Sequence, residues 1–415
     1  MIKKTPLYNW HKSAKANLAQ FGGYEMPLWY PEGVKKEHIA VITKAGIFDT
    51  SHMAVITLKG AQAFDLLQKT FTKNLSECAN FQKEPLKNGQ CVYGIFLNEK
   101  GETLDDSVVY RFDKDRFMIV VNAGMGALIT KHLMENSNGL DCKIKDLTDK
   151  IGKIDIQGVN SAKILLPLLK NGEKAFDNLK YFTFKGSFLP ESSVTLKDGS
   201  SILLSRTGYT GEFGFELFMQ SENLLKVWEM LIKAGKDFDL TPCGLAARDS
   251  LRAGAVLPLS HQDIGGWKFI NNPWIFALPY NKEKTEFTKD FIGKTALSDT
   301  ENKEYTYPFA GYNLRKIPAL SKVYDANQEK IGTVLTCATD IAIDRNEDKI
   351  FCITSKNISE KKTPKGLSCG FVKVNRKLNC GDKILLSDNK RKIKAEIVED
   401  IRPNRTARID IKGLL

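Results

Sequence analysis

The chain has 415 residues, of which 42% are hydrophobic and 27% charged, an ordinary globular balance that predicts two or three domains. It lacks a run of 18 apolar residues, an apolar stretch behind the N-terminal lysines and any CxxC pair among its eight cysteines. From these absences we expect no membrane span, no secretory signal, no disulfide frame and no typical zinc site, and we expect a cytoplasmic protein. The net charge of +12 favours acidic partners or anionic ligands, but its lysines are dispersed and no nucleic-acid motif occurs, so we expect no nucleic-acid partner.

Apolar spacing predicts the elements of the first half of the chain. Residues 60–75 have the spacing of an amphipathic helix. Residues 107–122 predict a β-hairpin, because β-rich arms flank a short polar turn. Residues 153–169 predict a strand, a turn at Gly158 and a helix.

In the second half of the chain, the predicted secondary structure changes near residue 300 from mixed helix and strand to strand alone. Residues 223–235 predict a strongly amphipathic helix ended by Gly235, and residues 243–255 predict another helix. Beyond about residue 300, short β-rich runs alternate with turns, which is typical of an all-β domain. The chain is therefore expected to be α+β first and then β.

The stretch SRTGYTGEFGFEL, residues 205–217, spaces three glycines every third residue around one acid, Glu212. Glycine reaches backbone angles that other residues avoid, so the spacing predicts a sharply folded loop with close backbone approach. From the pattern alone, two interpretations stay open. Glu212 is either a solvated acid in a hairpin turn or a carboxylate aimed at a ligand.

Two adjacent acids, Asp105 and Asp106, lie in the stretch LDDSVVY. Neighbours on a strand point to opposite faces, so one carboxylate can enter a cavity while the other meets solvent or caps a turn. The alternative is a pair of turn acids before a strand.

Eight collinear blocks of the sequence resemble one family. They include TPLYNWH near the start, FGGYEMPLWY at 21–30, YGIFLNEKGETLDDSVVY at 93–110, IDIQGVNSA, GYTGEFGFEL, PCGLAARDSLRAGAVL and DFIGKTAL at 290–297. In this order they resemble the glycine cleavage T-protein, or aminomethyltransferase, family over essentially the whole chain. The resemblance implies three domains around a central cavity that holds tetrahydrofolate, with an all-β, barrel-like or jelly-roll-like C-terminal domain.

The resemblance also implies a division of the chain. We expect a discontinuous folate-binding domain from residues 1–50 with 150–257, and a second α+β domain from residues 51–149. An aromatic connecting segment is expected at 258–299, followed by the C-terminal β domain at 300–415.

Matched positions inherit expected roles from the family. Glu212 matches the glutamate that grips the pterin, whose ring N–H and exocyclic amine are two parallel donors suited to a carboxylate. Asp105 matches the catalytic acid beside the reacting nitrogens of the folate. Further positions expected to bind folate are Tyr93, Asn122, Arg248 and Arg405, the last on the short match IRPNR. The alternatives are a core position for Tyr93, structural hydrogen bonding for Asn122 and a surface ion pair beside Asp249 for Arg248. For His52, in SHM, we favour structural hydrogen bonding.

Two segments depart from the family pattern. Residues 258–280 are crowded with Trp267, Phe269, Trp274 and Phe276 near the expected mouth of the pocket. An altered mouth suggests a different donor, although filling a seam between domains explains the aromatic residues equally well. Residues 340–365 add polar sequence to the C-terminal domain and predict a surface hairpin or loop insertion.

The resemblance implies an enzyme of one-carbon metabolism. It would transfer an aminomethyl group from the lipoyl arm of the H-protein to tetrahydrofolate, giving 5,10-methylenetetrahydrofolate and ammonia. One alternative is a related tetrahydrofolate-dependent methyltransferase or demethylase that uses a small methyl donor. A second is a non-catalytic folate-binding protein, whose usual KGCYxGQ signature is missing.

Overall fold

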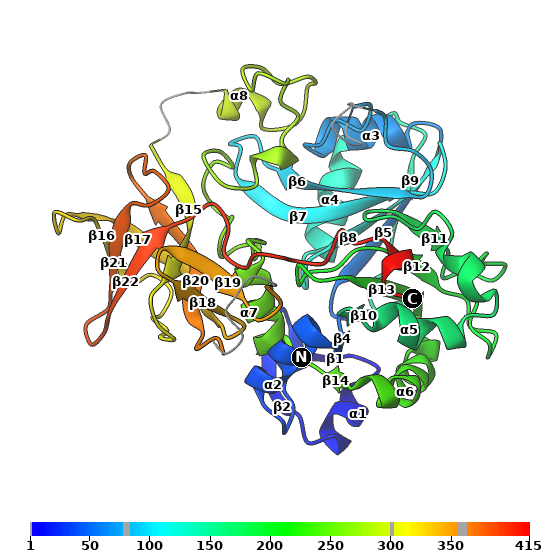
Figure 1. Ribbon diagram of the computed structural model, residues 1–415. Helices are drawn as coiled ribbons and strands as arrows, with labels where there is room; N and C mark the ends of the chain where they lie inside the picture. The colour runs from blue at the N-terminus through cyan, green and yellow to red at the C-terminus, as the bar shows by residue number, and fades with distance from the viewer. Residues whose placement is uncertain (1, 78–83, 299–302, 356–362) are drawn as a thin grey trace.

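The computed structural model describes residues 2–77, 84–298, 303–355 and 363–415. Two large sheets and a closed β-barrel form the three main parts of the described chain (Figure 1). Each part encloses its own buried apolar cluster, because a sheet with one apolar face must cover that face with another layer.

The first sheet has six strands in the order β11-β12-β13-β10-β4-β14. Its neighbours are antiparallel except β14 and β4, which run parallel. Two helices pack against it, and the fully buried Trp228 on the second of them belongs to the same core. The elements are β4 (Ala45–Asp49), β10 (Ile151–Gln157), β11 (Phe184–Gly186), β12 (Leu203–Ser205), β13 (Gly214–Gln220), β14 (Leu240–Pro242), α5 (Ser161–Leu165) and α6 (Leu224–Ala234).

The second sheet has five antiparallel strands in the order β6-β7-β8-β5-β9. Its two helices, α3 and α4, lie side by side and contribute to the apolar cluster of this sheet. The elements are β5 (Ala54–Lys59), β6 (Gln90–Leu97), β7 (Thr103–Arg111), β8 (Arg116–Val121), β9 (Lys143–Asp146), α3 (Ala63–Thr70) and α4 (Gly126–Asn136).

A closed barrel follows, in the order β15-β20-β17-β16-β21-β22. Alternate residues along its strands point inward and fill the interior, as expected for a small barrel. A two-stranded hairpin, β18 with β19, extends from it. The strands are β15 (Tyr305–Gly311), β16 (Lys322–Tyr324), β17 (Lys330–Asp340), β18 (Ile343–Asn346), β19 (Lys349–Cys352), β20 (Leu367–Val374), β21 (Lys383–Ser387) and β22 (Lys392–Ile397).

One helix, α7 (Leu245–Gly254), joins these parts. It packs against α2 (Val34–Thr43), against β3 and against the barrel strands β17 and β20. The N-terminal strands form a small sheet in the order β1-β3-β2. The remaining elements are β1 (Lys3–Lys4), β2 (Asn17–Phe21), β3 (Tyr24–Trp29), α1 (Tyr8–Ser13), α8 (Lys294–Leu297), η1 (Leu166–Leu168), η2 (Gly172–Phe176), η3 (Ser221–Asn223), η4 (Lys236–Phe238), η5 (Ile275–Ala277) and η6 (Ile411–Gly413).

The chain after β22, residues 398–415, is called the tail below. It runs from the barrel back to the first sheet and appears in red in Figure 1. The backbone N–H of Ala407 donates to the carbonyl of Gly211 at 3.1 Å, and Arg206 donates to the Ala407 carbonyl at 2.9 Å. The tail therefore brings residues from the far end of the sequence to the glycine-rich loop.

The structure confirms the predicted elements. The helices expected at 60–75, 223–235 and 243–255 are α3, α6 and α7, and the hairpin expected at 107–122 is formed by β7 and β8. Residues 153–169 form a strand, a turn and helical segments, and the part beyond residue 300 is β-rich. The proposed domain boundaries stay a prediction.

The described part of the segment 340–365 forms a hairpin, which is one of the two structures predicted for it. Ile343 and Cys352 are buried in an apolar cluster shared with α7, so one face of the hairpin covers the helix. Residues 356–362 lie outside the described residues.

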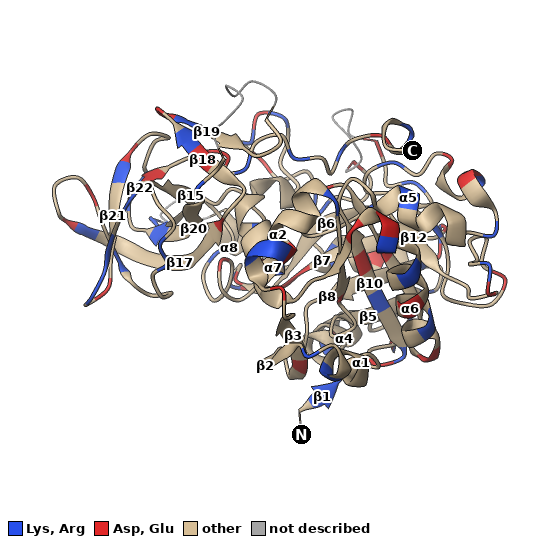
Figure 2. Cartoon of the chain, turned by 60° about the horizontal axis from the view of Figure 1, so that its bottom comes forward, with Lys and Arg blue, Asp and Glu red and all other residues tan. Residues whose placement is uncertain are grey.

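Basic side chains are distributed over the barrel, the helices and the first sheet in the view of Figure 2. Within the described ranges no helix is long and apolar enough to cross a membrane, and no group of three potential metal-ligating side chains occurs there. Seven cysteines are described and all are free thiols, whereas Cys78 lies outside the described residues.

Candidate active site

A cavity of about 1960 Å³ lies between the sheets, α7 and the tail. Its wall includes most of the residues expected from the family motifs. Those that line it are His52, Tyr93, Asn122, Glu212, Arg248 and Arg405, together with Asp106. The structure therefore brings together side chains that lie more than 300 positions apart in the sequence.

Of the two adjacent acids Asp105 and Asp106, Asp106 is the one that lines the cavity. The hydroxyl of Tyr93 on β6 donates to Asp106 Oδ2 at 2.8 Å, and Asn122 Nδ2, just after β8, donates to Asp106 Oδ1 at 2.6 Å. Burial and the neighbouring carboxylate of Asp105 raise the pKa of Asp106 to about 6. Such a group is a proton acceptor poised close to neutral pH.

Asp105, which the sequence-based expectation placed in the cavity, lies behind its wall and is fully buried. It accepts hydrogen bonds from Asn122 N and Nδ2, both at 2.8 Å, and from Ser260 Oγ at 3.0 Å. His261 Nε2 lies 3.7 Å from Asp105 Oδ1. Strand alternation separates the two acids as expected, but the face carrying Asp105 meets the segment after α7 instead of solvent, and Asp106 faces the cavity.

Asp105 thus anchors other groups of the wall. The nearby Asp105 carboxylate, ahead of the opposing effect of burial, raises the pKa of His261, a half-exposed residue that also lines the cavity. Asn122 binds both carboxylates and fixes their spacing. Ser260 and His261 were not singled out from the sequence, because only the tertiary fold brings them to β7.

Glu212 is buried, with 5% of its surface exposed, at the cavity wall. Its Oε1 accepts from Arg402 Nε at 3.1 Å, and its Oε2 accepts from Thr406 N at 3.2 Å and Thr406 Oγ1 at 2.7 Å. Gly211 has a positive φ of 77° and packs against the tail, which explains the need for glycine beside the acid. The solvated-turn interpretation is therefore wrong.

A carboxylate offers about four acceptor directions. Among the residues that the structure describes, hydrogen bonds from the tail occupy three acceptor directions of the Glu212 carboxylate. One direction, on Oε1, remains for a ligand. The expected pair of hydrogen bonds to a pterin thus reduces to one unless a tail donor moves away.

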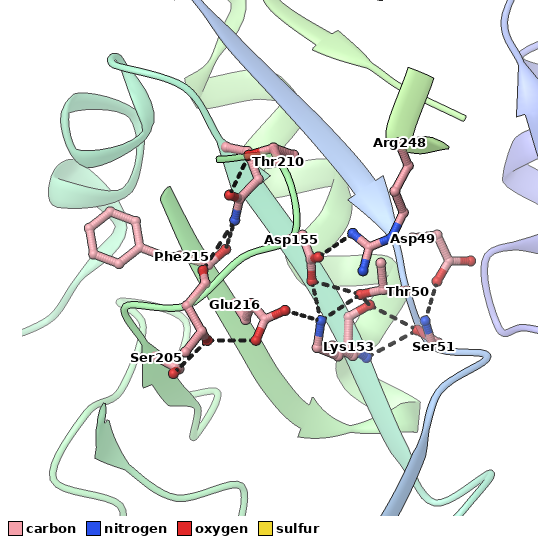
Figure 3. Close-up of polar contacts among 12 residues, drawn as sticks. Asp49, Thr50, Ser51, Lys153, Asp155, Ser205, Thr210, Phe215, Glu216 and Arg248 are labelled. Atoms are coloured by element: carbon pink, nitrogen blue, oxygen red, sulfur yellow. Dashed lines mark hydrogen bonds and ion pairs between the residues drawn. The ribbon is translucent and has the colours of Figure 1, made fainter. Parts of the chain in front are cut away.

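Arg248 on α7 belongs to a buried charge network, drawn in Figure 3. Its NH1 donates to Asp155 Oδ2 at 2.7 Å, and Lys153 bridges Asp155 and Glu216, the latter at 2.6 Å. Although burial opposes it, the two cations Lys153 and Arg248 lower the pKa of Asp155. Two cations and two carboxylates balance, as buried charges require.

The partner of Arg248 is therefore Asp155, and the surface ion pair given as the alternative for Arg248 is not formed, because Asp249 pairs with Arg252. The guanidinium lies 4.8 Å from the Tyr209 ring centroid, and it lines the cavity. One NH1 contact leaves other N–H groups of Arg248 directed away from Asp155.

Arg405 lines the cavity but pairs with Asp400 and with the carbonyl of Arg402, the latter at 3.0 Å. The tail arginine that contacts Glu212 is Arg402. The motif IRPNR therefore lies at the cavity, and its first arginine, Arg402, makes the buried contact with Glu212. No local pattern distinguishes the two, because the contact spans 190 residues.

His52 is buried, and its Nδ1 has no hydrogen-bond partner among the described residues. Its ring packs edge-on against Phe21 at 5.6 Å. Burial, with the nearby Arg248 guanidinium, lowers the pKa of His52 to about 4, so the imidazole is neutral at pH 7. The structural hydrogen bond expected for His52 is not seen at Nδ1.

The aromatic segment 258–280 contributes to both a core and the cavity. Trp274 is 1% exposed, donates from Nε1 to the Val256 carbonyl at 2.8 Å and packs 4.9 Å from Phe371 on β20. Phe276 is 56% exposed and lies 5.9 Å from Tyr93. The two aromatic residues therefore occupy different environments, and both line the cavity.

We expect Trp274→Ala to destabilise the fold by about 3–5 kcal/mol, because it removes a large buried ring from the seam with the barrel. Thermal and urea unfolding measure the change. Phe276→Ala is the matched control and should alter stability by less than about 0.5 kcal/mol. Equal unfolding midpoints for Trp274→Ala and wild type would show that the ring is not part of the core.

Residues 7–268 match the family model described as GCVT N-terminal domain. The chain belongs to the glycine cleavage T-protein (aminomethyltransferase) family. It is 33% identical over 356 residues to the aminomethyltransferase of Bacillus pumilus, covering 83% of this chain and 89% of that protein. It is 31% identical over 402 residues to the aminomethyltransferase of Natranaerobius thermophilus, covering 96% and 97%.

A solved T-protein family structure has the same fold. The glycine cleavage system aminomethyltransferase T from Bartonella henselae aligns with a TM-score of 0.74 and 27% identity, covering 96% of this chain and 97% of that one. The α+β arrangement with a C-terminal barrel, expected from the resemblance, is confirmed. Named members of the family are transferases, so the chain is assigned to an enzyme family.

Proposed function

We propose that the protein is a tetrahydrofolate-dependent aminomethyltransferase. It would take the aminomethyl group from the lipoyl arm of an H-protein and give 5,10-methylenetetrahydrofolate and ammonia. The observation that carries this proposal is Asp106, held by Tyr93 and Asn122 at the wall of a large cavity in a chain of the aminomethyltransferase family.

The residues present fit a folate. A cavity of about 1960 Å³ exceeds the roughly 300–1,000 Å³ of common small-molecule pockets, which leaves space for a second reactant. Tyr93 and Tyr209 supply flat apolar walls. Glu212 would accept one ring N–H, and Arg248 would donate to an acceptor of the ligand.

Tetrahydrofolate, when bound, supplies the nitrogen nucleophile that receives the one-carbon unit. Asp106 would accept a proton from that nitrogen and stabilise the positive charge that develops during transfer. Tyr93 OH and Asn122 Nδ2 would hold the carboxylate plane. Asp105, behind the cavity wall, would hold the Asn122 side chain in place. It would support catalysis only through Asn122.

The net charge of the chain would favour an acidic carrier as donor. The chain has a net charge of +12, which would accelerate encounter with an acidic carrier protein. Association should therefore weaken as salt concentration rises. We propose the cytoplasm as the site of action, in line with the free thiols.

Tetrahydrofolate binding to the full chain, measured by calorimetry, tests the proposal. We expect one site per chain, and competition by folate analogues that keep the pterin ring. A protein with full secondary structure but no heat of binding would rule out the folate-dependent function.

We expect the rate to follow the ionisation of Asp106. Because its pKa is raised to about 6, the carboxylate is mostly ionised at pH 7 and becomes protonated as the pH falls through 6. If it acts as a base, kcat/KM should fall about tenfold per pH unit below 6. A flat profile between pH 5 and 7 in the stable protein would contradict this role.

A small methyl donor is the second candidate. Exposed Phe276 beside Tyr93 favours it, because this aromatic edge belongs to the segment 258–280, which we expected from the sequence to depart from the family pattern. If the edge selects the donor, Phe276→Ala should raise the KM for the donor severalfold and leave folate affinity near that of wild type. Unchanged KM values for both substrates would exclude this edge from donor selection.

A further inference from the structure

The buried side chain of Arg402 connects the tail to the wall of the cavity. Its side chain is fully buried, and NH1 donates to Asp340 Oδ2 on β17 at 2.6 Å. NH2 donates to the carbonyls of Thr210 and Leu251, the latter at 3.3 Å. Nε donates to Glu212 Oε1 at 3.1 Å.

These contacts fix the guanidinium on three sides. Arginine presents its N–H donors in a rigid planar fork. If the Arg402 guanidinium rotated to follow a different orientation of the Glu212 carboxylate, its hydrogen bonds to Asp340 and to the two carbonyls would break. Gly254 packs so closely on Asp340 and Arg402 that a Cβ would collide with both. Arg402 therefore has one available orientation.

The other oxygen of Glu212 is fixed by the same tail. Thr406 donates to Oε2 through its backbone N–H and its hydroxyl, and the hydroxyl also accepts from Phe213 N at 2.8 Å. With Arg402 on Oε1, the plane of the carboxylate cannot turn. Its single remaining acceptor direction is aimed by the tail.

A purely structural ion cluster is the competing explanation. Asp340 supplies a control, because it belongs to the cluster without touching Glu212. It is fully buried and is held from the other side by His38 Nε2 at 2.9 Å and by Ala342 N at 3.0 Å. Asp340→Asn removes a charge from the cluster but keeps a side-chain oxygen that can accept from Arg402 NH1, and the two carbonyls still hold NH2. The Arg402–Glu212 contact should therefore stay in place.

We propose that Arg402 is a positioning residue of the ligand site, which sets the plane of the Glu212 carboxylate so that its free Oε1 direction meets an N–H donor of the bound heterocycle. This inference rests on the proposed folate function. It implies that the barrel and the tail complete a site otherwise built from the two sheets.

The experiment compares Arg402→Lys with Asp340→Asn in the full chain. Lysine keeps the charge but loses the planar fork. We expect Arg402→Lys to weaken tetrahydrofolate binding by about tenfold, the loss of one well-aimed charge-assisted hydrogen bond, with kcat changed less than about threefold. Asp340→Asn should lower Tm and leave the dissociation constant within about twofold of wild type.

A second pair of variants, both at Thr406, tests the same inference if Arg402→Lys does not fold. Thr406→Val removes the hydroxyl donor to Oε2 and should weaken binding severalfold, whereas Thr406→Ser should restore it. Wild-type affinity in Thr406→Val and in folded Arg402→Lys would overturn the inference. So would equal losses of affinity in Arg402→Lys and Asp340→Asn. Absence of binding in the wild type would instead refute the proposed function, and the inference with it.

Discussion

Replacing Asp106 by asparagine should reduce turnover by roughly 10²-fold or more, because the change removes the charge at the cavity wall and keeps the shape. Tetrahydrofolate affinity should stay within about tenfold, since the proposed role is expressed mainly in the transition state. Steady-state kinetics and calorimetry on the same preparation measure both quantities. Tyr93 and Asn122 should remain in place, because the amide oxygen can still accept from Asn122 Nδ2 and the amide N–H₂ can donate to the Tyr93 hydroxyl oxygen, which both donates and accepts.

Asp105→Asn is the matched comparison on the same strand. Its carboxylate is fully buried and accepts from Asn122 and Ser260, so an amide N–H₂ would face donors. We expect a loss of about 1–3 kcal/mol in the free energy of unfolding, which Asp106→Asn should not show. Turnover that survives in Asp106→Asn but disappears in a fully stable Asp105→Asn would reverse the assignment.

Removing the Glu212 side chain should weaken tetrahydrofolate binding and destabilise the protein together. Glu212→Ala deletes one proposed charge-assisted hydrogen bond to the ligand, worth about 1.5–3 kcal/mol. It also leaves Arg402 with one fewer carboxylate in a buried cluster, where breaking a pair costs about 3–5 kcal/mol. Calorimetry and chemical unfolding separate the two losses.

Glu212→Gln separates them further. The amide keeps the size of the side chain and one acceptor oxygen but loses the charge opposite Arg402. We expect a smaller loss of stability than for alanine, with affinity still reduced. Wild-type tetrahydrofolate affinity in folded Glu212→Gln and Glu212→Ala would remove Glu212 from the ligand site.

Much of the fold could be predicted from local patterns. The 3.6-residue periodicity of 223–235 and the β-rich arms around the turn after residue 111 each depend on a few neighbouring residues, and α6 and the β7–β8 hairpin follow from them. The buried inner face of the 340–365 hairpin did not follow, because its cover is α7, about 100 residues earlier.

The site was predictable only in part. Tyr93, Asn122 and Glu212 line the cavity as the family motifs implied. Alternation along β7 required the two acids to face opposite ways but could not say which face meets the cavity, because that depends on how the segment after α7 packs on the strand. Arg402 reaches Glu212 across 190 residues, and no local spacing encodes such a contact.

A single-turnover assay with tetrahydrofolate and aminomethylated, lipoylated H-protein tests the proposed reaction, and it measures the appearance of 5,10-methylenetetrahydrofolate and ammonia. Asp106→Asn, at a concentration that saturates it with tetrahydrofolate, is the control. We predict that the wild type forms both products in equal amounts and that Asp106→Asn forms them roughly 10²-fold more slowly. Wild-type protein that binds tetrahydrofolate but forms neither product from this carrier would contradict the account.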